Sequence, residues 1–493
     1  MKNRDIQNTE DQQDTKTTSE NHGLFKFALG VRHYQSGLLF LLLLVGYALR
    51  VNMSVGIVAM VDNTSANPDF EEYDWNEQKQ SLILSSFFWG YVLIQLPAGT
   101  WARKFGAKIL LTVSMGVCSV LTLLTPVAAN LGGWVAVVTL RILLGVSQGF
   151  IFPCVHTLLA TWVPPSERSR LGTFVYAGSP LGNVLMLAIS GLLASSSLGW
   201  PSIFYASGII GVIWTALFFT FGSNSPEVDV RITPTEREFI QESLGQETDT
   251  EEIKKLTTPW RRIFTSLPFI SLIVAHSAQN WGFWTLLTEI PTYMKNVLEM
   301  DIKKNALLSA LPYLVMWLGS FVMSPISDYL INRGYLSVGN TRKLFNSIGL
   351  YIPMFALIGL GYVTKDHTEI AVFLLTFGVG INSGTYVGFM LNHMDLSPVY
   401  AGTLMGITNF SANIMSILGP LFVGLIVSDA TNPVEWRAVF FVAAAIYFVG
   451  NTFFVIFGSG EIQPWNNSSK RDGDELESHD AGKSTETVTT IIK

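Results

Sequence analysis

Residues 37–61 read GLLFLLLLVGYALRVNMSVGIVAMV, and this stretch decides the class of fold. A helix that crosses a membrane needs about 20 mostly apolar residues. The stretch meets that requirement with a single charge, Arg50, near its middle. Residues 1–23 before it are polar, and the run is too long for a secretory signal and lacks a small-residue cleavage site. It therefore predicts a first membrane span that stays in the protein.

Similar apolar segments recur along the rest of the chain. Of its 493 residues, 49% are hydrophobic and only 14% are charged, whereas a soluble protein carries roughly 25% charged residues. The net charge of −6 gives no indication of nucleic-acid binding. We expect an all-α membrane protein of about twelve transmembrane helices, surrounded by the lipid bilayer. The candidate spans are 37–61, 80–101, 107–128, 134–161, 171–195, 201–222, 268–291, 305–330, 344–363, 369–393, 400–427 and 436–458.

The charged segments divide the chain into two similar halves with a linker and two tails. We expect a cytoplasmic tail at 1–36, a six-helix half at 37–222, a linker at 223–267, a second six-helix half at 268–458 and a cytoplasmic tail at 459–493. In the linker, Thr233-Pro-Thr-Glu236 predicts a capping box that starts a short helix. A second short helix is expected at 258–262. Two six-helix halves around a site at the membrane midplane are the design of the major facilitator fold.

Basic residues in the short loops predict the orientation. They follow spans two, four and eight, and the loops on the opposite side at 129–133 and 196–200 carry no charge. Because Lys and Arg concentrate in cytoplasmic loops, both termini and the linker are expected in the cytoplasm. The basic residues are Arg103, Lys104, Lys108, Arg168, Arg170, Arg333, Arg342 and Lys343. A glycosylation sequon at Asn63 lies on the outer side, very near the membrane, which leaves its use open.

The ends of spans two and eight form a candidate gate. Gly99 to Gly106 and Ser324 to Gly334 both place a small-residue helix end before a basic turn. Asp328 is the one acid in these two loops, so it is the expected partner of the basic turn that contains Arg103 and Lys104, with Arg333 beside it. The alternative is an exposed surface pair that contributes at most about 1 kcal/mol.

The few ionisable side chains deep in the first half indicate an anion site. Arg50 and Arg141 lie inside predicted spans, and the first, second, fourth and fifth spans offer no deep carboxylate to pair with them. An arginine keeps its charge and has a planar fork that fits carboxylate or phosphate. Two turns after Arg141, Gln148 shares its helix face, and His156 lies within about 60° of it. We assign the arginines to substrate, and Gln148 and His156 to coupling; a structural histidine remains the alternative for His156.

The seventh span adds a polar and aromatic stripe. His276, Asn280 and Trp284 are spaced i, i+4 and i+8, so they lie on one face. Asn280 and Trp284 are candidate substrate contacts, although core packing is an alternative for the tryptophan. Glu289, near the outer end, is a candidate coupling residue or an exposed acid. In the fifth span, Gly178, Gly182 and Gly191 are expected to permit close helix packing.

The sequence gives no indication of an enzyme. It has no phosphate-binding glycine loop, and no nucleophile–base pair or metal cluster lies at depth. The two cysteines, Cys118 and Cys154, fall inside predicted spans and suggest neither a disulfide nor a metal site. A transporter fits the deep cations better than an enzyme does.

Several sequence blocks resemble the anion:cation symporter family of the major facilitator superfamily. This family includes sialin, the vesicular glutamate and nucleotide transporters and the sodium–phosphate cotransporters. The similarity covers about residues 30–460, and the overall pattern is most similar to insect sequences described as inorganic phosphate cotransporters. The blocks that carry it are 86–97, 141–170, 280–313 and 392–406, and they include Trp89, Pro97, Trp162, Asn392, His393 and Asp395.

The resemblance implies alternating access around a central anion site, with coupling to sodium or protons. Arg50 and Arg141 match the family's substrate-linked arginines, and His156 matches its span-four histidine. Sialin-type members carry glutamates where this chain has Leu144 and Gln148, so sialin-type proton coupling is disfavoured. Vesicular glutamate transporters carry an arginine at the position of Gln279 and a histidine at that of Leu84, so glutamate is disfavoured as well.

The sequence thus predicts a secondary active transporter of small anions. Sodium-coupled symport of inorganic phosphate or an organic anion comes first. One alternative is a proton-coupled transporter of sialate or acidic amino acids in lysosomal or vesicular membranes, and another is a membrane sensor that transports nothing. We expect a monomer with no cofactor other than the coupling ion, Na⁺ or H⁺. The plasma membrane is slightly favoured over lysosomal or vesicular membranes.

Overall fold

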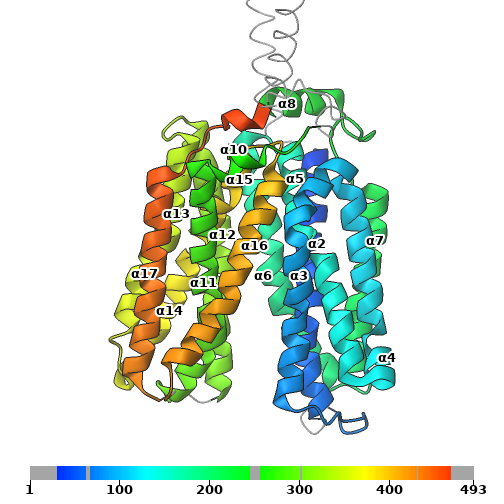
Figure 1. The fold of residues 1–493 in the computed structure, drawn as a ribbon, viewed down its shortest axis with the longest axis vertical. Coiled ribbons are helices and arrows are strands. Elements are labelled where there is room, and N and C mark those ends of the chain that lie inside the picture. The colour runs from blue at the N-terminus through cyan, green and yellow to red at the C-terminus, as the bar shows by residue number, and fades with distance from the viewer. Residues whose placement is uncertain (1–29, 63–66, 245–255, 300–301, 430, 468–493) are drawn as a thin grey trace, which may run out of the picture.

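The computed structural model describes residues 30–62, 67–244, 256–299, 302–429 and 431–467. Every regular element in these ranges is a helix, and Figure 1 shows most of them as long rods packed side by side. Ten helical segments of the described chain are long and apolar enough to cross a membrane. One of them, Ala107–Trp162, has 56 residues, which suffices for two crossings of about 20 residues each. Counting it as two spans and adding α11 (Leu267–Asn296) confirms the expected twelve.

The first half contains the six predicted spans, with the third and the start of the fourth joined in one helix, α4 (Ala107–Gln148). Asn76 begins the second span by accepting a hydrogen bond from the backbone N–H of Lys79, a common N-cap. A short turn, η3, occupies Pro165–Glu167 between the fourth and fifth spans. The helices are α2 (Val31–Val61), α3 (Glu77–Phe105), α4 (Ala107–Gln148), α5 (Ile151–Trp162), α6 (Arg168–Ala194) and α7 (Pro201–Phe221).

The fourth span is not the continuous helix expected at 134–161. Gly133 turns the chain inside α4 with φ 58° and ψ −152°, a conformation that glycine adopts readily. The fourth span therefore consists of two helical pieces. The first is the part of α4 that follows Gly133 and ends at Gln148, and the second is α5, which begins after Gly149 and Phe150. Arg141 and Gln148 therefore lie on one helix, while His156 lies on the next.

Glycines bring the first and fifth spans into close contact. A Cβ atom on Gly178 would lie 2.3 Å from the carbonyl oxygen of Phe40, and one on Gly182 would lie 2.2 Å from that of Leu44. These two positions therefore require glycine for the approach of α6 to α2, as predicted. Gly191 has no atom within 4 Å of an added Cβ, so the same expectation was wrong there.

The second half repeats this arrangement, and its tenth span, the fourth of its own half, is also interrupted. The expected helix at 369–393 ends at Ile381 and resumes as a π-helical segment, η5, at Tyr386–Met390. Gly388 within that segment leaves helical geometry, with ψ −112°. Such π segments are often found at functional sites. The helices are α11, α12 (Ile302–Asn332), α13 (Val338–Leu360), α14 (Thr368–Ile381), α15 (Leu391–Leu396), α16 (Ala401–Ile426) and α17 (Pro433–Phe457).

Two short linker helices, α8 (Pro234–Leu244) and α10 (Trp260–Phe264), lie at one end of the bundle, called here the linker side (Figure 1). The backbone N–H of Glu236 donates to Thr233 Oγ1 at 3.3 Å, which confirms one half of the predicted capping box. The other half was wrong. The Glu236 carboxylate instead accepts bonds from the backbone N–H groups of Val31 and Arg32 and from Arg32 Nη1, and so fixes α8 to the start of α2.

The two halves meet through small residues near the linker side. A Cβ atom on Gly402 of α16 would lie 2.5 Å from the carbonyl oxygen of Pro153, and one on Gly406 would lie 2.4 Å from that of Gln95. Gly99 of α3 approaches Gly402 equally closely. In Figure 1 the two halves draw apart toward the end opposite α8. The backbones are therefore in contact on the linker side.

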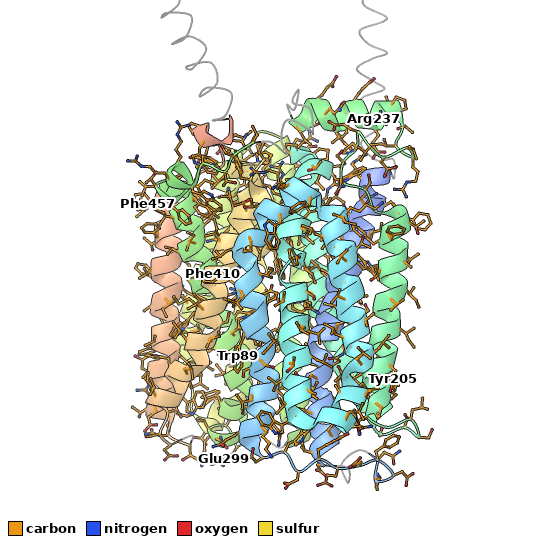
Figure 2. All side chains as sticks on the ribbon, turned by 45° about the vertical axis from the view of Figure 1, so that its right-hand side comes forward. Trp89, Tyr205, Arg237, Glu299, Phe410 and Phe457 are labelled. Carbon is orange, nitrogen blue, oxygen red and sulfur yellow. The ribbon has the colours of Figure 1, made fainter. Side chains whose placement is uncertain are left out.

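The outer surface of the bundle suits a lipid environment. Trp89 and Tyr205 are 47% and 41% exposed, and Figure 2 shows them on the side of the bundle, between Arg237 at the linker end and Glu299 at the opposite end. Many other large apolar side chains are also exposed along the spans. A soluble monomer rarely exposes apolar patches on this scale.

Candidate substrate site and gate

A central cavity of about 110 Å³ lies between the two halves. The first half contributes side chains from α2, α3, α5 and α6, and the second half from α11, η5 and α16. Aromatic rings and amides make up much of the lining, including Tyr47, Tyr91, Tyr176, Asn183, Tyr386 and Asn409. The cavity is complete within one chain.

Arg50 is the cation in the described lining of this cavity. Its guanidinium carbon lies 4.5–4.8 Å from the ring centroids of Tyr47, Phe87 and Tyr91, close enough for cation–π attraction. Within the described ranges the side chain has no carboxylate partner, and it is only 8% exposed. The site thus holds a buried positive charge that rings, rather than an acid, stabilise, and an anion in the cavity would complete it.

Gln148 positions Arg50 from behind. Its Oε1 accepts a hydrogen bond from Arg50 Nε at 3.4 Å, while its Nε2 donates to the carbonyl oxygen of Gly46 at 2.9 Å. The side chain is fully buried and stands outside the cavity lining. Gln148, a predicted coupling residue, therefore reaches the site only through its hydrogen bond with Arg50 of α2.

Arg141, a predicted substrate residue, does not line the cavity. Its guanidinium lies 5.0 Å from the ring centroid of Phe87, and its donors reach the carbonyl oxygens of Ile83 and Arg50 at 3.4 and 3.3 Å. Phe87 contacts both arginines. The rotation of α4 about its axis therefore places Arg141 behind the aromatic wall, where it supports the backbone at Arg50.

The seventh span supplies the opposite wall. Asn280, Trp284 and His276 all line the cavity, as their i, i+4 and i+8 spacing indicates. Phe88 of α3 stands edge-on to Trp284 at 6.2 Å between centroids. Gln279 also lines the cavity and donates to Asn382 Oδ1 at 3.2 Å, which links α11 to the broken tenth span. The side chain of Glu289 lies outside the described residues.

His156 joins the two halves instead of facing the cavity. Its Nδ1 hydrogen-bonds with the hydroxyl of Tyr176 on α6, and its Nε2 lies 3.0 Å from the carbonyl oxygen of Met390 on η5. His393 of α15 reaches the same carbonyl through Nδ1 at 3.0 Å. The rings of His156 and His393 are 5.1 Å apart and nearly perpendicular.

The chain of hydrogen bonds continues across the second half. His393 Nε2 lies 2.8 Å from Thr408 Oγ1, which in turn lies 3.1 Å from His276 Nδ1. His276 and Tyr176, the two ends of the chain, both line the cavity. Sequence reasoning missed His393, although its signal was an ionisable side chain at the end of a predicted span.

Asp328 contacts the first half, but not at the position expected. Its two carboxylate oxygens accept bonds from the backbone N–H groups of Ser169 and Arg170 at 3.0 and 2.9 Å, and Arg170 Nε lies 3.4 Å away. The acid therefore caps the N-terminus of α6, where a negative charge is favourable. The expected pairing with Arg103 was wrong.

Arg103 contacts the linker and α16 instead. Its Nη2 donates to Thr258 Oγ1 at 2.8 Å, and its guanidinium lies 4.6 Å from the ring centroid of Tyr400. Arg333 is exposed and stacks on Tyr329 at 5.7 Å. It lies in a second, open cavity of about 450 Å³ on the linker side, lined also by Glu167, Arg170 and Asp328.

A buried ion network that the sequence reasoning missed accompanies Asp328. Asp395 accepts bonds from Arg168 of the first half at 2.8 Å and from Arg342 of the second half at 2.7 Å. Arg342 Nη1 also donates to Ser169 Oγ at 3.0 Å. Arg168 and Arg342 appeared in the sequence only as basic loop residues. Together these contacts tie the halves on the linker side, so that side is closed in this conformation.

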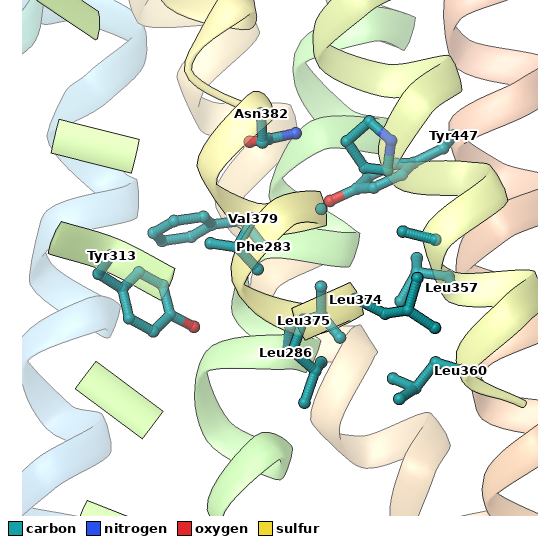
Figure 3. A pocket seen from close by; sticks show the side chains of 13 residues that line it. Phe283, Leu286, Tyr313, Leu357, Leu360, Leu374, Leu375, Val379, Asn382 and Tyr447 are labelled. Carbon is teal, nitrogen blue, oxygen red and sulfur yellow. The ribbon is translucent and has the colours of Figure 1, made fainter. Parts of the chain in front are cut away.

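Figure 3 shows a third cavity, which is enclosed by the second half alone. Phe283, Tyr313, Leu357, Val379 and Tyr447 surround it, and Asn382 is its amide. Its volume is about 10 Å³, close to the minimum for one water molecule. This space is too small and too apolar for an anion, so the central cavity remains the candidate site.

Comparison with solved structures identifies the fold. The xylose:proton symporter XylE matches with a TM-score of 0.65 and 15% identity, over 88% of this chain and 98% of the other. The Escherichia coli fucose:proton symporter FucP matches with a TM-score of 0.58 and 13% identity, over 84% and 97%. At this identity the likeness concerns the fold alone.

Comparison with known sequences identifies the family. The sequence model of the family described as Major Facilitator Superfamily matches residues 37–420 of this chain. "Putative inorganic phosphate cotransporter" of Drosophila ananassae is 44% identical over 88% of this chain and 94% of its own length. Human sialin is 38% identical over 85% and 87%, and bovine vesicular glutamate transporter 1 is 35% identical over 85% and 76%. This chain therefore belongs to the anion:cation symporter family of the major facilitator superfamily.

Proposed function

We propose that this chain is a secondary active transporter that carries small anions by alternating access around the central cavity. The observation that carries the proposal is the Arg50 guanidinium. It stands at the wall of a cavity between the two halves, without a carboxylate partner among the described residues. A structural arginine at such depth would be expected to have an acid beside it, because an uncompensated buried charge is costly.

Inorganic phosphate or a small organic anion is the first substrate class to test. The names of the similar insect proteins and of sialin support an anion of this kind. The hydrogen-bonding amides and hydroxyls of the lining suit oxygen-rich anions, because an oxyanion accepts several such bonds at once. The transport unit is one chain, and the plasma membrane is its proposed location. Neither a resident cofactor nor an enzymatic step is part of the proposal.

Counterflow in proteoliposomes tests the proposal directly. The purified protein is reconstituted into proteoliposomes that contain unlabelled phosphate, sialate, urate or an acidic amino acid. Uptake of the same anion in labelled form is then followed. Arg50→Lys keeps the charge but loses the planar fork, so KM should rise about tenfold, the cost of one charge-assisted hydrogen bond. Arg261→Lys, on the exposed surface of α10, is the matched control and should leave KM unchanged.

Two outcomes would argue against this function. Wild-type protein that exchanges none of these anions would favour the sensor alternative, in which the fold is kept without transport. Equal KM values for Arg50→Lys and the wild type would remove Arg50 from the substrate site, even if transport occurs.

A further inference from the structure

We propose that His276 takes up the coupling proton, and that the hydrogen-bond chain through Thr408 and His393 keeps one ring nitrogen of His276 ready to accept it. The inference rests on the proposed anion transport and names its coupling ion as H⁺. It differs from the expectation of sodium, which was drawn from the neutral side chains at Leu144 and Gln148. Because of those two residues, span four has no carboxylate to carry a proton. The histidines of the second half can still take one up.

The central carbonyl of the chain fixes the direction of its hydrogen bonds. The backbone oxygen of Met390 can only accept, so His156 must carry a proton on Nε2 and His393 must carry one on Nδ1. In their neutral forms, His156 Nδ1 and His393 Nε2 are then acceptors. The hydroxyl of Tyr176 donates to the first, and that of Thr408 donates to the second.

This direction determines the tautomer of His276. The hydroxyl of Thr408 has two acceptors in reach, His393 Nε2 at 2.8 Å and the carbonyl oxygen of Met405 at 3.3 Å. We assign its single proton to the nearer one, because His393 Nε2 needs a donor in the neutral ring, and Thr408 Oγ1 then accepts from His276. His276 Nδ1 therefore carries the proton at that contact of 3.1 Å. The remaining nitrogen, Nε2, has a free lone pair in the neutral ring. His276 lines the central cavity. We therefore take this basic nitrogen, on the side of the ring away from Thr408, as the group that meets the substrate.

The charges around His276 make proton uptake depend on the anion. The groups that face it are Thr408 of α16, His393 of α15, Phe389 of η5 and His156 of α5. Across the cavity lie Arg50 and the phenols of Tyr47, Tyr91, Tyr176 and Tyr386, and the described lining contains no carboxylate. Without an anion, a proton on His276 would add a second positive charge to that of Arg50 in a largely buried site, which is unfavourable.

An anion in the cavity reverses this balance. It attracts Arg50 on one wall and a protonated His276 on the other, so each bound charge lowers the cost of the other. The step is a simple transfer: hydronium in the open cavity gives a proton to Nε2, an N–H bond forms and water remains. The new N–H then donates to the anion. Anion and proton enter together and leave together, which is symport.

Asparagine at position 276 separates proton binding from structural support. The amide Nδ2 of Asn lies where His has Nδ1, so His276→Asn keeps a donor for Thr408 but cannot take up a proton. Ser277→Ala is the control: its hydroxyl makes a 2.9 Å bond to Ser411 between the same two helices, and Ser277 stands outside the cavity lining. It removes one inter-helix bond without touching the proposed proton site.

Two modes of transport in sodium-free proteoliposomes test the inference on the full chain. The probe is labelled inorganic phosphate, then sialate and an acidic amino acid. Counterflow at equal pH needs no net proton movement, whereas accumulation driven by an inward proton gradient does. His276→Asn should lower accumulation about tenfold more than counterflow, and it should flatten the dependence of accumulation on pH between about 5.5 and 7.5. Ser277→Ala should behave as the wild type.

Thr408 gives a second test that does not change His276. Thr408→Val removes the hydroxyl that fixes the tautomer at nearly constant volume, so it should reduce proton-driven accumulation more than counterflow. Thr408→Ser restores the hydroxyl and should restore accumulation. A merely structural role would predict loss of both transport modes together.

The failures of the two proposals are distinguishable. If the wild type shows counterflow but accumulates anion only with a sodium gradient, the proton site is wrong and the anion transporter stands. The same holds if His276→Asn keeps the pH dependence of the wild type. If no anion shows counterflow, the proposed function itself is wrong, and the proton site falls with it.

Discussion

At the scale of single residues, the sequence predicted which charged side chains lie deep in the helix bundle. It did not predict which of them point into the cavity. Arg50 and Arg141 both lie inside the bundle, as the hydropathy pattern indicated. Only Arg50 reaches the cavity, because the rotation of each helix about its axis depends on packing with its neighbours. A pattern of residues along one chain contains no information about that rotation when apolar residues surround the helix.

The different positions of the two arginines lead to different kinetic effects. Arg141 supports Arg50 through the carbonyl oxygen of Arg50 and through the ring of Phe87. Arg141→Lys should therefore lower the turnover rate with a smaller change in KM than Arg50→Lys produces, because the anion does not meet Arg141 in this conformation. Initial rates of counterflow across a range of anion concentrations separate the two parameters. A larger rise in KM for Arg141→Lys would instead place it in direct contact with substrate.

Gln148 offers a pH-dependent test of the same site. Gln148→Glu would place a carboxylate 3.4 Å from Arg50 Nε, where it would neutralise the guanidinium and compete with the anion. Protonation removes the competing charge and restores a donor for the carbonyl oxygen of Gly46. KM should therefore be high at neutral pH and fall as the pH is lowered, and the fall should be steeper than in the wild type, whose Gln148 has no titratable group. Anion affinity measured across pH checks it, with Gln148→Asn as the neutral control.

At the scale of helices, the sequence predicted the existence and approximate limits of the spans better than their internal breaks. Apolar length is a property of composition, so the twelve spans could be found from it. The turn at Gly133 and the π segment Tyr386–Met390 depend on local backbone geometry and on tertiary contacts that hydropathy does not represent. Gly149 and Phe150 keep right-handed helical angles between α4 and α5, and His156 on α5 contacts the second half through the carbonyl oxygen of Met390.

The glycines of α6 provide a matched test of close packing. Gly182→Ala would place a Cβ atom 2.2 Å from the carbonyl oxygen of Leu44, so α6 must move away from α2. The change should lower stability by about 1–3 kcal/mol, as overpacking does. Gly191→Ala on the same helix meets open space and should be neutral or slightly stabilising, because alanine favours the helix. Thermal unfolding in detergent compares them, and equal transitions would contradict the packing.

At the scale of the whole molecule, the gate shows that a residue's role in joining the halves is easier to predict than the groups it contacts there. Asp328 was correctly expected to reach across to the first half, because the ends of the two halves must meet in one state. Its shortest contacts are with the backbone N–H groups of Ser169 and Arg170, which every residue except proline has, and the side chain of Arg170 lies 3.4 Å away. Arg103, at the corresponding position of the first half, contacts the linker and Tyr400.

This gate gives a prediction about the balance between the two open states. In the present conformation Asp328 caps α6 from the other half, and Asp395 bridges Arg168 and Arg342 beside it. Asp328→Asn keeps the size but loses the charge and one of the acceptors, at a cost of about 1–3 kcal/mol. The loss applies only to the state closed on the linker side, so the equilibrium should shift toward the state open there, by about tenfold or more.

A single reactive cysteine in the cavity measures this shift. Cys118 and Cys154 are replaced by alanine, and Ser179→Cys places a thiol in the cavity lining. In the Asp328→Asn background, a membrane-impermeant maleimide should react with this thiol faster from the linker side and more slowly from the opposite side. Turnover should fall while KM for the anion changes little, because Asp328 lies outside the central cavity. Asp366→Asn, an exposed acid on the turn Lys365–His367, should leave the labelling rates unchanged. Labelling rates in Asp328→Asn that equal those of the control would mean that this cap does not hold the gate and that the Asp395 network closes the linker side alone.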